Sequence, residues 1–230
     1  PENTLTASHF STDPVLEAAL TEKDKPELLA TLRALAAMAD VTSLPQAQPR
    51  GLGHAVLCGR HVVGRCPFAV LLPDDVIDAE PTALQQMLNV FAEVNGPVLL
   101  VERVPRSDVS RYGIIAAEPV RDGVLRVTDL VEKPDPDKAP SEFAVIGRYI
   151  LTPDIFELLE QTQVGADGEM QLTDALRTML SVRPIHACVL QGTRLDAGTK
   201  LGYVKAVLHF ALKRPELGPE LKVFIKQLLG

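Results

Sequence analysis

The sequence predicts an α/β protein in which helices flank a mixed sheet. The apolar runs 68–72 and 97–101 are typical of strands buried on both faces, and a helical pattern separates them. The section 112–130 contains two β-rich runs around Arg121-Asp122-Gly123, which predicts an antiparallel hairpin. A crossover unit and a hairpin in one chain together favour a mixed sheet over a purely parallel one.

The composition is typical of a globular protein with one large domain: 230 residues, 46% hydrophobic and 23% charged. The formal net charge of −7 argues against a nucleic-acid partner, because phosphate backbones are held by clustered Lys and Arg. No apolar run approaches the roughly 20 residues of a membrane span. The first residues lack the pattern of a signal peptide, so we expect a cytoplasmic protein with no membrane partner.

The N-terminal segment is predicted to be helical over 14–39, where apolar residues recur at three- and four-residue steps, with a break near Lys25-Pro26. A short strand is predicted at 41–44. The loop 46–53 then leads into a helix that begins near His54. A glycine-containing loop between a strand and a helix favours anion binding.

The strand 68–72 ends at Pro73-Asp74-Asp75, and a helix over about 80–94 connects it to the strand 97–101. This order predicts a right-handed β-α-β crossover. The remaining predicted elements are strands at 142–151 and 186–190 and helices at 153–160, 172–181, 198–213 and 217–228.

Glu132 and Lys133 form an adjacent acid and base at the end of a β-rich run, which Pro134 stops because it cannot donate to a sheet. A bend at the proline can bring both side chains to one pocket rim. Such a pair suits a ligand that carries hydroxyls and a phosphate, as a sugar phosphate does. The alternative is an ordinary ion pair at a strand end.

Asp74 and Asp196 are candidate magnesium ligands. Magnesium prefers a few carboxylates together with phosphate and water oxygens, so two aspartates from separate loops would suffice. For either residue alone, a turn or a helix cap is the alternative. The three cysteines, Cys58, Cys66 and Cys188, have no CxxC spacing and suggest neither a zinc site nor a disulfide framework.

Gln46 and the Gly51-Leu52-Gly53 segment are candidates for recognising a base. The Gln46 amide can both donate to and accept from a base edge, and glycines let a backbone approach a flat ligand closely. The polar loop 165–174 runs into a helix. Its acidic residues either complement the helix dipole or help to line a sugar site.

Seven motifs, taken in order, resemble the bacterial UTP-glucose-1-phosphate uridylyltransferases, and the resemblance covers almost the whole chain. No single motif is specific, but their order and spacing together are. They are QAQPRGLGHAV (46–56), FAVLLPDD (68–75), SRYGII (110–115), LVEKP (130–134), AVIGRY (144–149), GEMQLTD (168–174) and LDAGTKLGY (195–203).

The resemblance implies a reaction and roles on the nucleotide side. UTP and glucose 1-phosphate would react to give UDP-glucose and pyrophosphate, with Mg²⁺ as cofactor. The Gln46 side chain and the Gly51 backbone would read the uracil, and Asp74 and Asp196 would hold the metal ion. A thymidylyltransferase for the same sugar phosphate, and a truncated non-catalytic homologue that binds the sugar phosphate or a partner, are the alternatives.

On the sugar side, the resemblance implies that Gly113, Glu132 and Val145 line the glucose and that Lys133 binds its phosphate. Lys133 and Asp74 would be the catalytic residues. No general base is expected, because phosphate oxygens are already ionised at neutral pH and the reaction needs mainly positioning and charge neutralisation.

The resemblance also implies a three-layer, Rossmann-like nucleotide-diphospho-sugar transferase fold, with a nucleotidyltransferase domain at 1–197 and a helical segment at 198–230. The latter would serve as a contact in a homo-oligomer, either a dimer or a tetramer. The family's first strand and its glycine-rich GxGTR-type loop have no match here. Either the sequence is part of a longer protein, which we favour, or it is a shortened homologue, and by itself we expect it to be inactive.

Overall fold

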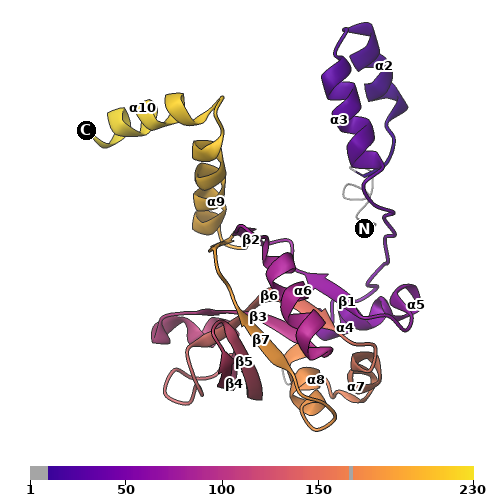
Figure 1. Cartoon of the computed structure of the whole chain (residues 1–230), viewed down its shortest axis with the longest axis vertical. Coiled ribbons are helices and arrows are strands. Elements are labelled where there is room, and N and C mark those ends of the chain that lie inside the picture. Colours follow the sequence, from indigo (N-terminus) through magenta and orange to yellow (C-terminus); the bar gives the residue numbers. More distant parts are fainter. Residues whose placement is uncertain (1–9, 166–167) are drawn as a thin grey trace. The chain divides into compact units, whose positions relative to one another are not determined.

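The computed structural model describes residues 10–165 and 168–230, and these contain all elements discussed below (Figure 1). Residues 1–9 and two positions of the predicted polar loop, Ala166 and Asp167, lie outside the described residues. Contacts group the chain into two compact units, Pro1–Gln48 and Pro49–Gly230, which are considered separately. The boundary that we expected between 197 and 198 stays a prediction.

The first unit contains a pair of helices, α2 (Pro14–Glu22) and α3 (Pro26–Ala36). Each begins at a proline, which fits the first helical turn, and Asp13 caps α2 by accepting from the Leu16 amide at 3.0 Å. The predicted break is therefore confirmed. The predicted strand at 41–44 is wrong, because these residues have no regular structure. A strand needs a neighbour to pair with, and the described part of this unit offers none.

The second unit is built on a six-stranded sheet in the order β1-β6-β3-β7-β5-β4. Only β3 and β7 pair in parallel, and the other pairings are antiparallel, so the prediction of a mixed sheet is confirmed. The strands are β1 (Phe68–Leu71), β3 (Val98–Arg103), β4 (Gly113–Arg121), β5 (Val124–Glu132), β6 (Phe143–Leu151) and β7 (His186–Val189).

The connection from β1 to β3 differs from the predicted crossover in its strand order. Both β1 and β3 pair antiparallel with β6, so they run in the same direction, but β6 lies between them. The prediction of burial on both faces is confirmed for β3 but is wrong for β1, which lies at the edge of the sheet and alternates between half-buried and exposed residues. The hairpin is confirmed: β4 pairs with β5, the turn passes through Gly123 at φ +70°, and β4 also meets β6 at Ile114↔Ala144.

Helices cover both faces of this sheet. Along β3, Leu99 and Val101 belong to one buried cluster, whereas Val98 and Leu100 belong to another, as expected from the alternation of side chains along a strand. The first cluster includes residues of α4 (Gly51–Cys58), α7 (Ile155–Gln161) and α8 (Leu172–Met179), and the second includes residues of α6 (Ala83–Val94).

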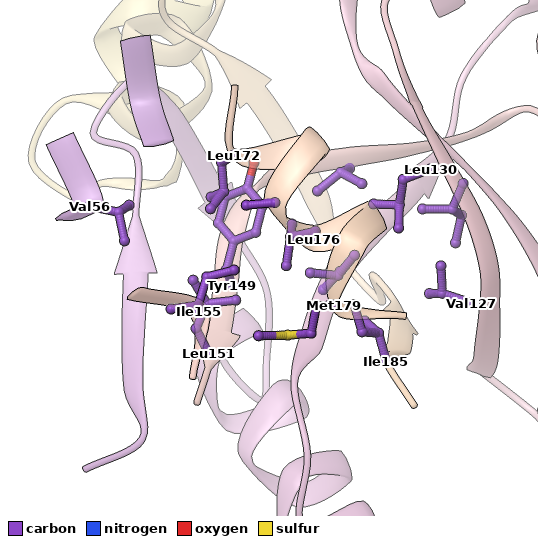
Figure 2. Packing of buried hydrophobic residues seen from close by; sticks show 14 of the residues in the cluster. Val56, Val127, Leu130, Tyr149, Leu151, Ile155, Leu172, Leu176, Met179 and Ile185 are labelled. Carbon is purple, nitrogen blue, oxygen red and sulfur yellow. The ribbon is translucent and has the colours of Figure 1, made fainter. Parts of the chain in front are cut away.

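Figure 2 shows the first cluster from close by, with Leu172, Leu176 and Met179 of α8 directed toward strand residues such as Tyr149 and Leu151. Their spacing along α8 follows the helical period, which places them on one buried face. The start of α8 is thereby fixed against the sheet, and this matters for the site because Thr173 lies in its first turn.

The remaining elements are the short helices α5 (Arg60–Val63) and η1 (Arg106–Arg111) and the C-terminal helices α9 (Lys200–Lys213) and α10 (Gly218–Leu229). The predicted helices near 153–160, 172–181, 198–213 and 217–228 are all confirmed within a few residues. Among the helices of the described residues, none has the length and apolar character that crossing a bilayer would require.

A second, two-stranded sheet was not predicted. Its strands are β2 (Asp75–Asp78) and β8 (Thr193–Asp196), which pair antiparallel with Asp75 opposite Asp196. We expected Asp75 to lie in the loop that follows β1, but it is the first residue of the separate strand β2. Strands of four residues with mixed polarity carry little periodic signal, so only the folded chain reveals the pairing.

Candidate active site

A cavity of about 350 Å³, called here the central pocket, lies in the second unit. It collects residues from the ends of β5 and β8, from the segments before β2 and β4, and from the start of α8. Six of the eight predicted site residues line it: Asp74, Gly113, Glu132, Lys133, Val145 and Asp196.

The two remaining predicted residues are not among those that line the central pocket. Gln46 belongs to the first unit, so its role in reading a base stays a prediction. Gly51, at φ +86°, has a structural reason of its own, because a Cβ there would come within 2.9 Å of the Glu169 Cβ and of the Met170 carbonyl oxygen. Its neighbour Gly53 donates its amide to that carbonyl at 2.9 Å. The glycines thus permit close packing against the chain's own backbone.

The adjacent acid and base do reach the same pocket. Lys133 adopts a left-handed conformation, φ +43°, directly after β5 ends at Glu132, and its amide donates to the Tyr112 carbonyl at 2.9 Å. The Lys133 Nζ lies 3.6 Å from the Glu132 Oε1. A left-handed backbone is unusual for a lysine and is expected where the surroundings impose it. The reversal that we ascribed to Pro134 therefore takes place one residue earlier.

Glu132 is oriented by Thr173, which belongs to the polar segment 165–174 that the sequence offered as a lining of the sugar site. The Thr173 hydroxyl, in the first turn of α8, donates to the Glu132 Oε2 at 2.7 Å. A Cβ on Gly113 would lie 3.1 Å from that carboxylate oxygen and 3.1 Å from the Thr173 hydroxyl. A glycine at position 113 therefore leaves space in front of both groups, which remain able to bond a ligand hydroxyl.

Asp74 and Asp196 converge, as the two-carboxylate hypothesis requires. A Cβ built on Gly198 would lie 3.0 Å from the Asp74 Oδ2 and 3.2 Å from the Asp196 Oδ1. The pairing of β2 with β8 causes this approach, and a backbone bond from Ala197 N to Asp74 O at 2.8 Å extends it. Asp196 also accepts from the Arg111 guanidinium at 3.0 Å.

The donor chemistry at this point suits a hard divalent cation, because both groups are carboxylates and the cavity leaves room for ligand or water oxygens. Within residues 10–165 and 168–230, no group of three or more His, Cys, Asp or Glu side chains is arranged to hold a metal ion. A site of this kind would take its remaining ligands from a bound substrate, as magnesium commonly does with phosphates.

Asp75 and Arg194 form a buried ion pair beside the two aspartates. The Arg194 Nε donates to the Asp75 Oδ1, and its Nη1 donates to the Glu102 Oε1 at 2.9 Å and to the Tyr112 hydroxyl at 3.3 Å. Burial raises the pKa of the Asp75 carboxyl, and the neighbouring Arg194 opposes that rise. Sequence reasoning missed this pair, although Arg194 and Asp196 lie on the same side of a strand.

A second arginine holds the backbone that leads to Asp75. The Arg148 guanidinium donates to the carbonyl oxygens of Leu72, at 2.6 Å, and of Asp75. Burial lowers the pKa of Arg148, and the nearby Asp75 and Asp74 oppose that effect. Arg148 lies next to Gly147, which adopts φ +24° where a Cβ would come within 2.1 Å of the Asp75 Oδ2. The loop from Leu72 to Asp75 is therefore fixed on both its backbone and its side-chain side.

Comparison with known proteins connects this geometry to one family. The family model described as nucleotidyl transferase matches residues 6–211. The uridylyltransferase YngB of Bacillus subtilis (strain 168), a UTP-glucose-1-phosphate uridylyltransferase, is 44% identical over 221 residues, which are 96% of this chain and 74% of that protein. An enzyme of the same description from Staphylococcus epidermidis is 41% identical over 220 residues, covering 96% of this chain and 76% of the relative.

Solved structures give the same result. A UDP-glucose pyrophosphorylase complexed with UDP-glucose superposes with a TM-score of 0.83 at 38% identity, covering 92% of this chain and 78% of that one. A UTP-bound enzyme of this type from Acinetobacter baumannii gives a TM-score of 0.86 at 39% identity, over 96% and 78% of the two chains. The chain thus spans about three quarters of the proteins that it matches.

Proposed function

Because the chain belongs to the nucleotidyl transferase family, we propose that it transfers the uridylyl group of UTP to glucose 1-phosphate, releasing pyrophosphate and forming UDP-glucose. Relatives that carry this activity in their names are 41% to 44% identical over nearly the whole chain. The observation that carries the proposal is the central pocket, which joins a lysine and a glutamate to two converging aspartates.

The sugar side of the pocket binds the acceptor substrate. Glu132, oriented by Thr173, accepts hydrogen bonds from glucose hydroxyls in the space that Gly113 leaves open, and Val145 contributes an apolar wall. The Lys133 ammonium binds the phosphate of glucose 1-phosphate. Its side chain is 55% exposed and pairs with the adjacent Glu132 at 3.6 Å, so it can turn toward a ligand at little cost.

The aspartate side receives the triphosphate. Asp74 and Asp196 would hold Mg²⁺, which when bound neutralises part of the negative charge of the two reacting phosphates. Gln46 and the Gly51 backbone would read the uracil, as the sequence predicts. The two carboxylates alone would repel a triphosphate, so their role requires the cation.

The reaction needs little covalent chemistry from the protein. A phosphate oxygen of glucose 1-phosphate attacks the α-phosphorus of UTP and forms a new P–O bond, while the bond between the α-phosphorus and the bridging oxygen breaks and pyrophosphate leaves with the electron pair. The oxygen is already ionised at neutral pH, so no general base is required. Lys133 and Glu132 hold the attacking molecule in place, which removes much of the entropic cost of bringing two anions together.

The finer features of the fold and assembly are proposed on the same basis. The sheet with helices on both faces would be the three-layer arrangement of nucleotide-diphospho-sugar transferases. The C-terminal helices would carry a homo-oligomer contact, because they expose large apolar residues: Leu201, Val204, Val207, Leu208, Phe224 and Leu228. A cytoplasmic location stays a prediction from the sequence.

Pyrophosphate release from UTP and from dTTP, each with glucose 1-phosphate and Mg²⁺, tests the proposal. We expect turnover with UTP to exceed turnover with dTTP by at least about tenfold. Equal rates would favour a thymidylyltransferase. Absence of turnover with either nucleotide, together with calorimetric binding of glucose 1-phosphate, would favour a non-catalytic sugar-phosphate-binding protein.

A further inference from the structure

We propose that Arg194 is a positioning residue, which sets the spacing of Asp74 and Asp196 through its ion pair with Asp75. This inference rests on the proposed function in one respect only: it takes the two aspartates to be a cation site. Arg194 lines the central pocket, but its guanidinium bonds three protein groups, Asp75, Glu102 and the Tyr112 hydroxyl, so its effect is exerted through the residues that it holds.

The place of Arg194 in the chain is suited to this task. It lies two residues before Asp196 on β8, and Asp75 lies directly after Asp74. In the β2–β8 ladder Asp75 is opposite Asp196. The ion pair therefore connects the strand that ends in one carboxylate to the segment that carries the other, across a sheet of only two short strands. Four residues per strand supply few backbone bonds, so a side-chain link adds a large share of the restraint.

The contacts of the Arg194 guanidinium leave it little freedom. It bonds Asp75, Glu102 and the Tyr112 hydroxyl, and its carbon lies 5.1 Å from the centre of the Tyr112 ring. The side chains of Arg194 and Asp75 are 8% and 9% exposed. A buried fork with three partners is a rigid connector, unlike the solvent-exposed ion pairs elsewhere in this unit.

The same contacts decide which of two adjacent aspartates is available to a cation. One carboxylate oxygen of Asp75 accepts from Arg194, and the other lies so close to Gly147 that a Cβ there would come within 2.1 Å. Asp75 is thus committed to the protein. Asp74 keeps its carboxylate directed toward Gly198, where Asp196 also lies.

The connection extends toward the sugar side through Tyr112. Its hydroxyl accepts from Arg194, and its carbonyl accepts from the Lys133 amide at 2.9 Å, where the backbone is left-handed. A displacement of Arg194 would therefore shift residues on both the aspartate side and the sugar side of the pocket. The aspartates would move most, because the Asp75 link is the shortest path between Arg194 and a ligand group.

Replacement by lysine separates geometry from charge. Arg194→Met would leave uncompensated carboxylates that attract cations more strongly, which would mask a loss of positioning. Arg194→Lys keeps the positive charge, but a single ammonium cannot reproduce the fork that reaches Asp75, Glu102 and Tyr112 together. The matched control is Arg121→Lys, since Arg121 pairs with Glu93 at 2.8 Å and lies outside the central pocket.

The experiment measures Mn²⁺ binding to the protein without substrates, by water-proton relaxation, together with the unfolding temperature of each variant. We expect Arg194→Lys to weaken Mn²⁺ binding by about tenfold or more, as substitutions behind metal ligands commonly do, and Arg121→Lys to change it by less than about twofold. A lower unfolding temperature with unchanged Mn²⁺ affinity of the folded protein would overturn the proposal and leave Arg194 a purely structural residue.

If Arg194→Lys does not fold, Tyr112→Phe takes its place, because it removes one hydroxyl partner of Arg194 and leaves the backbone bond to Lys133 intact. We then expect Mn²⁺ binding about threefold weaker, and an unchanged affinity overturns the proposal. An unmodified protein that transfers uridylyl groups but binds no Mn²⁺ would refute the positioning role alone. Mn²⁺ binding that depends on Arg194, without turnover, would refute only the proposed reaction.

Discussion

The two sides of the central pocket differ in how their charged side chains are held. On the aspartate side, the ion pair of Asp75 and Arg194 is nearly inaccessible to solvent and is held by partners from several elements. On the sugar side, Lys133 is mostly exposed, and Glu132 is oriented by one hydroxyl. Groups that must keep a fixed spacing are therefore held by a buried ion pair, whereas groups that contact the sugar phosphate keep the freedom to move toward it.

The physical reason lies in solvation. A buried carboxylate without a partner costs several kcal/mol, so Asp75 and Arg194 stabilise each other only in one geometry. An exposed lysine loses little when it moves, because water replaces its contacts. If this comparison is correct, substitutions on the aspartate side should affect both stability and activity, except at the groups that face the ligand. Substitutions on the sugar side should affect activity alone.

The largest effect is expected for Asp74→Asn, which removes one of the two converging carboxylate charges. Turnover should fall by about a thousandfold, with the unfolding temperature little changed, because Asp74 faces the pocket rather than the core. Asp135→Asn is the control, since Asp135 is exposed and pairs with exposed Lys138 at 3.4 Å. Near-normal turnover of Asp74→Asn in steady-state assays would contradict its assigned role.

Lys133→Ala should lower turnover by about a hundredfold through loss of the phosphate-binding ammonium. Its free energy of unfolding should stay within about 0.5 kcal/mol of the parent, because the Lys133 amide, not its side chain, bonds Tyr112. Lys138→Ala, a few residues along, is the matched control. A much lower free energy of unfolding for Lys133→Ala would show that the Lys133 side chain contributes to stability, contrary to what we expect for the sugar side.

Gly147→Ala tests the aspartate side by adding an atom next to the Asp75 carboxylate rather than by removing a group. The new Cβ would meet the Asp75 carboxylate at 2.1 Å, so we expect a loss of about 3 kcal/mol of stability in urea denaturation. Gly64→Ala is the control, since Gly64 also has a positive φ but has open space around it, and should cost about 1 kcal/mol. Equal losses in the two variants would mean that the close approach to Asp75 has no energetic weight.

Glu132→Gln should raise the KM for glucose 1-phosphate by about tenfold and change the KM for UTP by less than about twofold. The amide keeps the shape of the side chain but weakens its acceptor strength toward sugar hydroxyls and toward Thr173. Initial rates with each substrate varied in turn provide the measurement. The reverse pattern would move Glu132 from the sugar side to the nucleotide side.

The smallest effect concerns α9, which lies beyond the pocket. Hydrogen bonds from Lys213 and His209 lower the pKa of Asp78 below its ordinary value of 3.8. The link between α9 and β2 is therefore fully present above pH 3.8 and is lost as the pH falls through the lower value in the folded protein. Relative to the intrinsic exchange rate at each pH, amide exchange in α9 should become faster over that acidic range, and Asp78→Asn should show the faster relative exchange already at neutral pH.

The core elements of the second unit were predictable because each carries its own periodic signal. The continuous apolar run of β3 and the buried face of α8 reflect local geometry repeated over several residues. The hairpin was predictable because its turn chemistry is local. The predicted strand at 41–44 is wrong because a local β-like pattern is not sufficient: in the part of the chain that the structure describes, no strand pairs with these residues.

The mixed sheet, most helices and six of the residues that line the central pocket were predictable from the sequence alone, because motifs and periodicity depend only on residue types and their order. The folded chain was needed to reveal that β6 separates β1 from β3, that β2 and β8 pair, and that Lys133 has a left-handed backbone. The link between Asp75 and Arg194 belongs to the same group, since it joins residues 119 positions apart. No local pattern can encode a contact whose energy depends on burial by the rest of the chain.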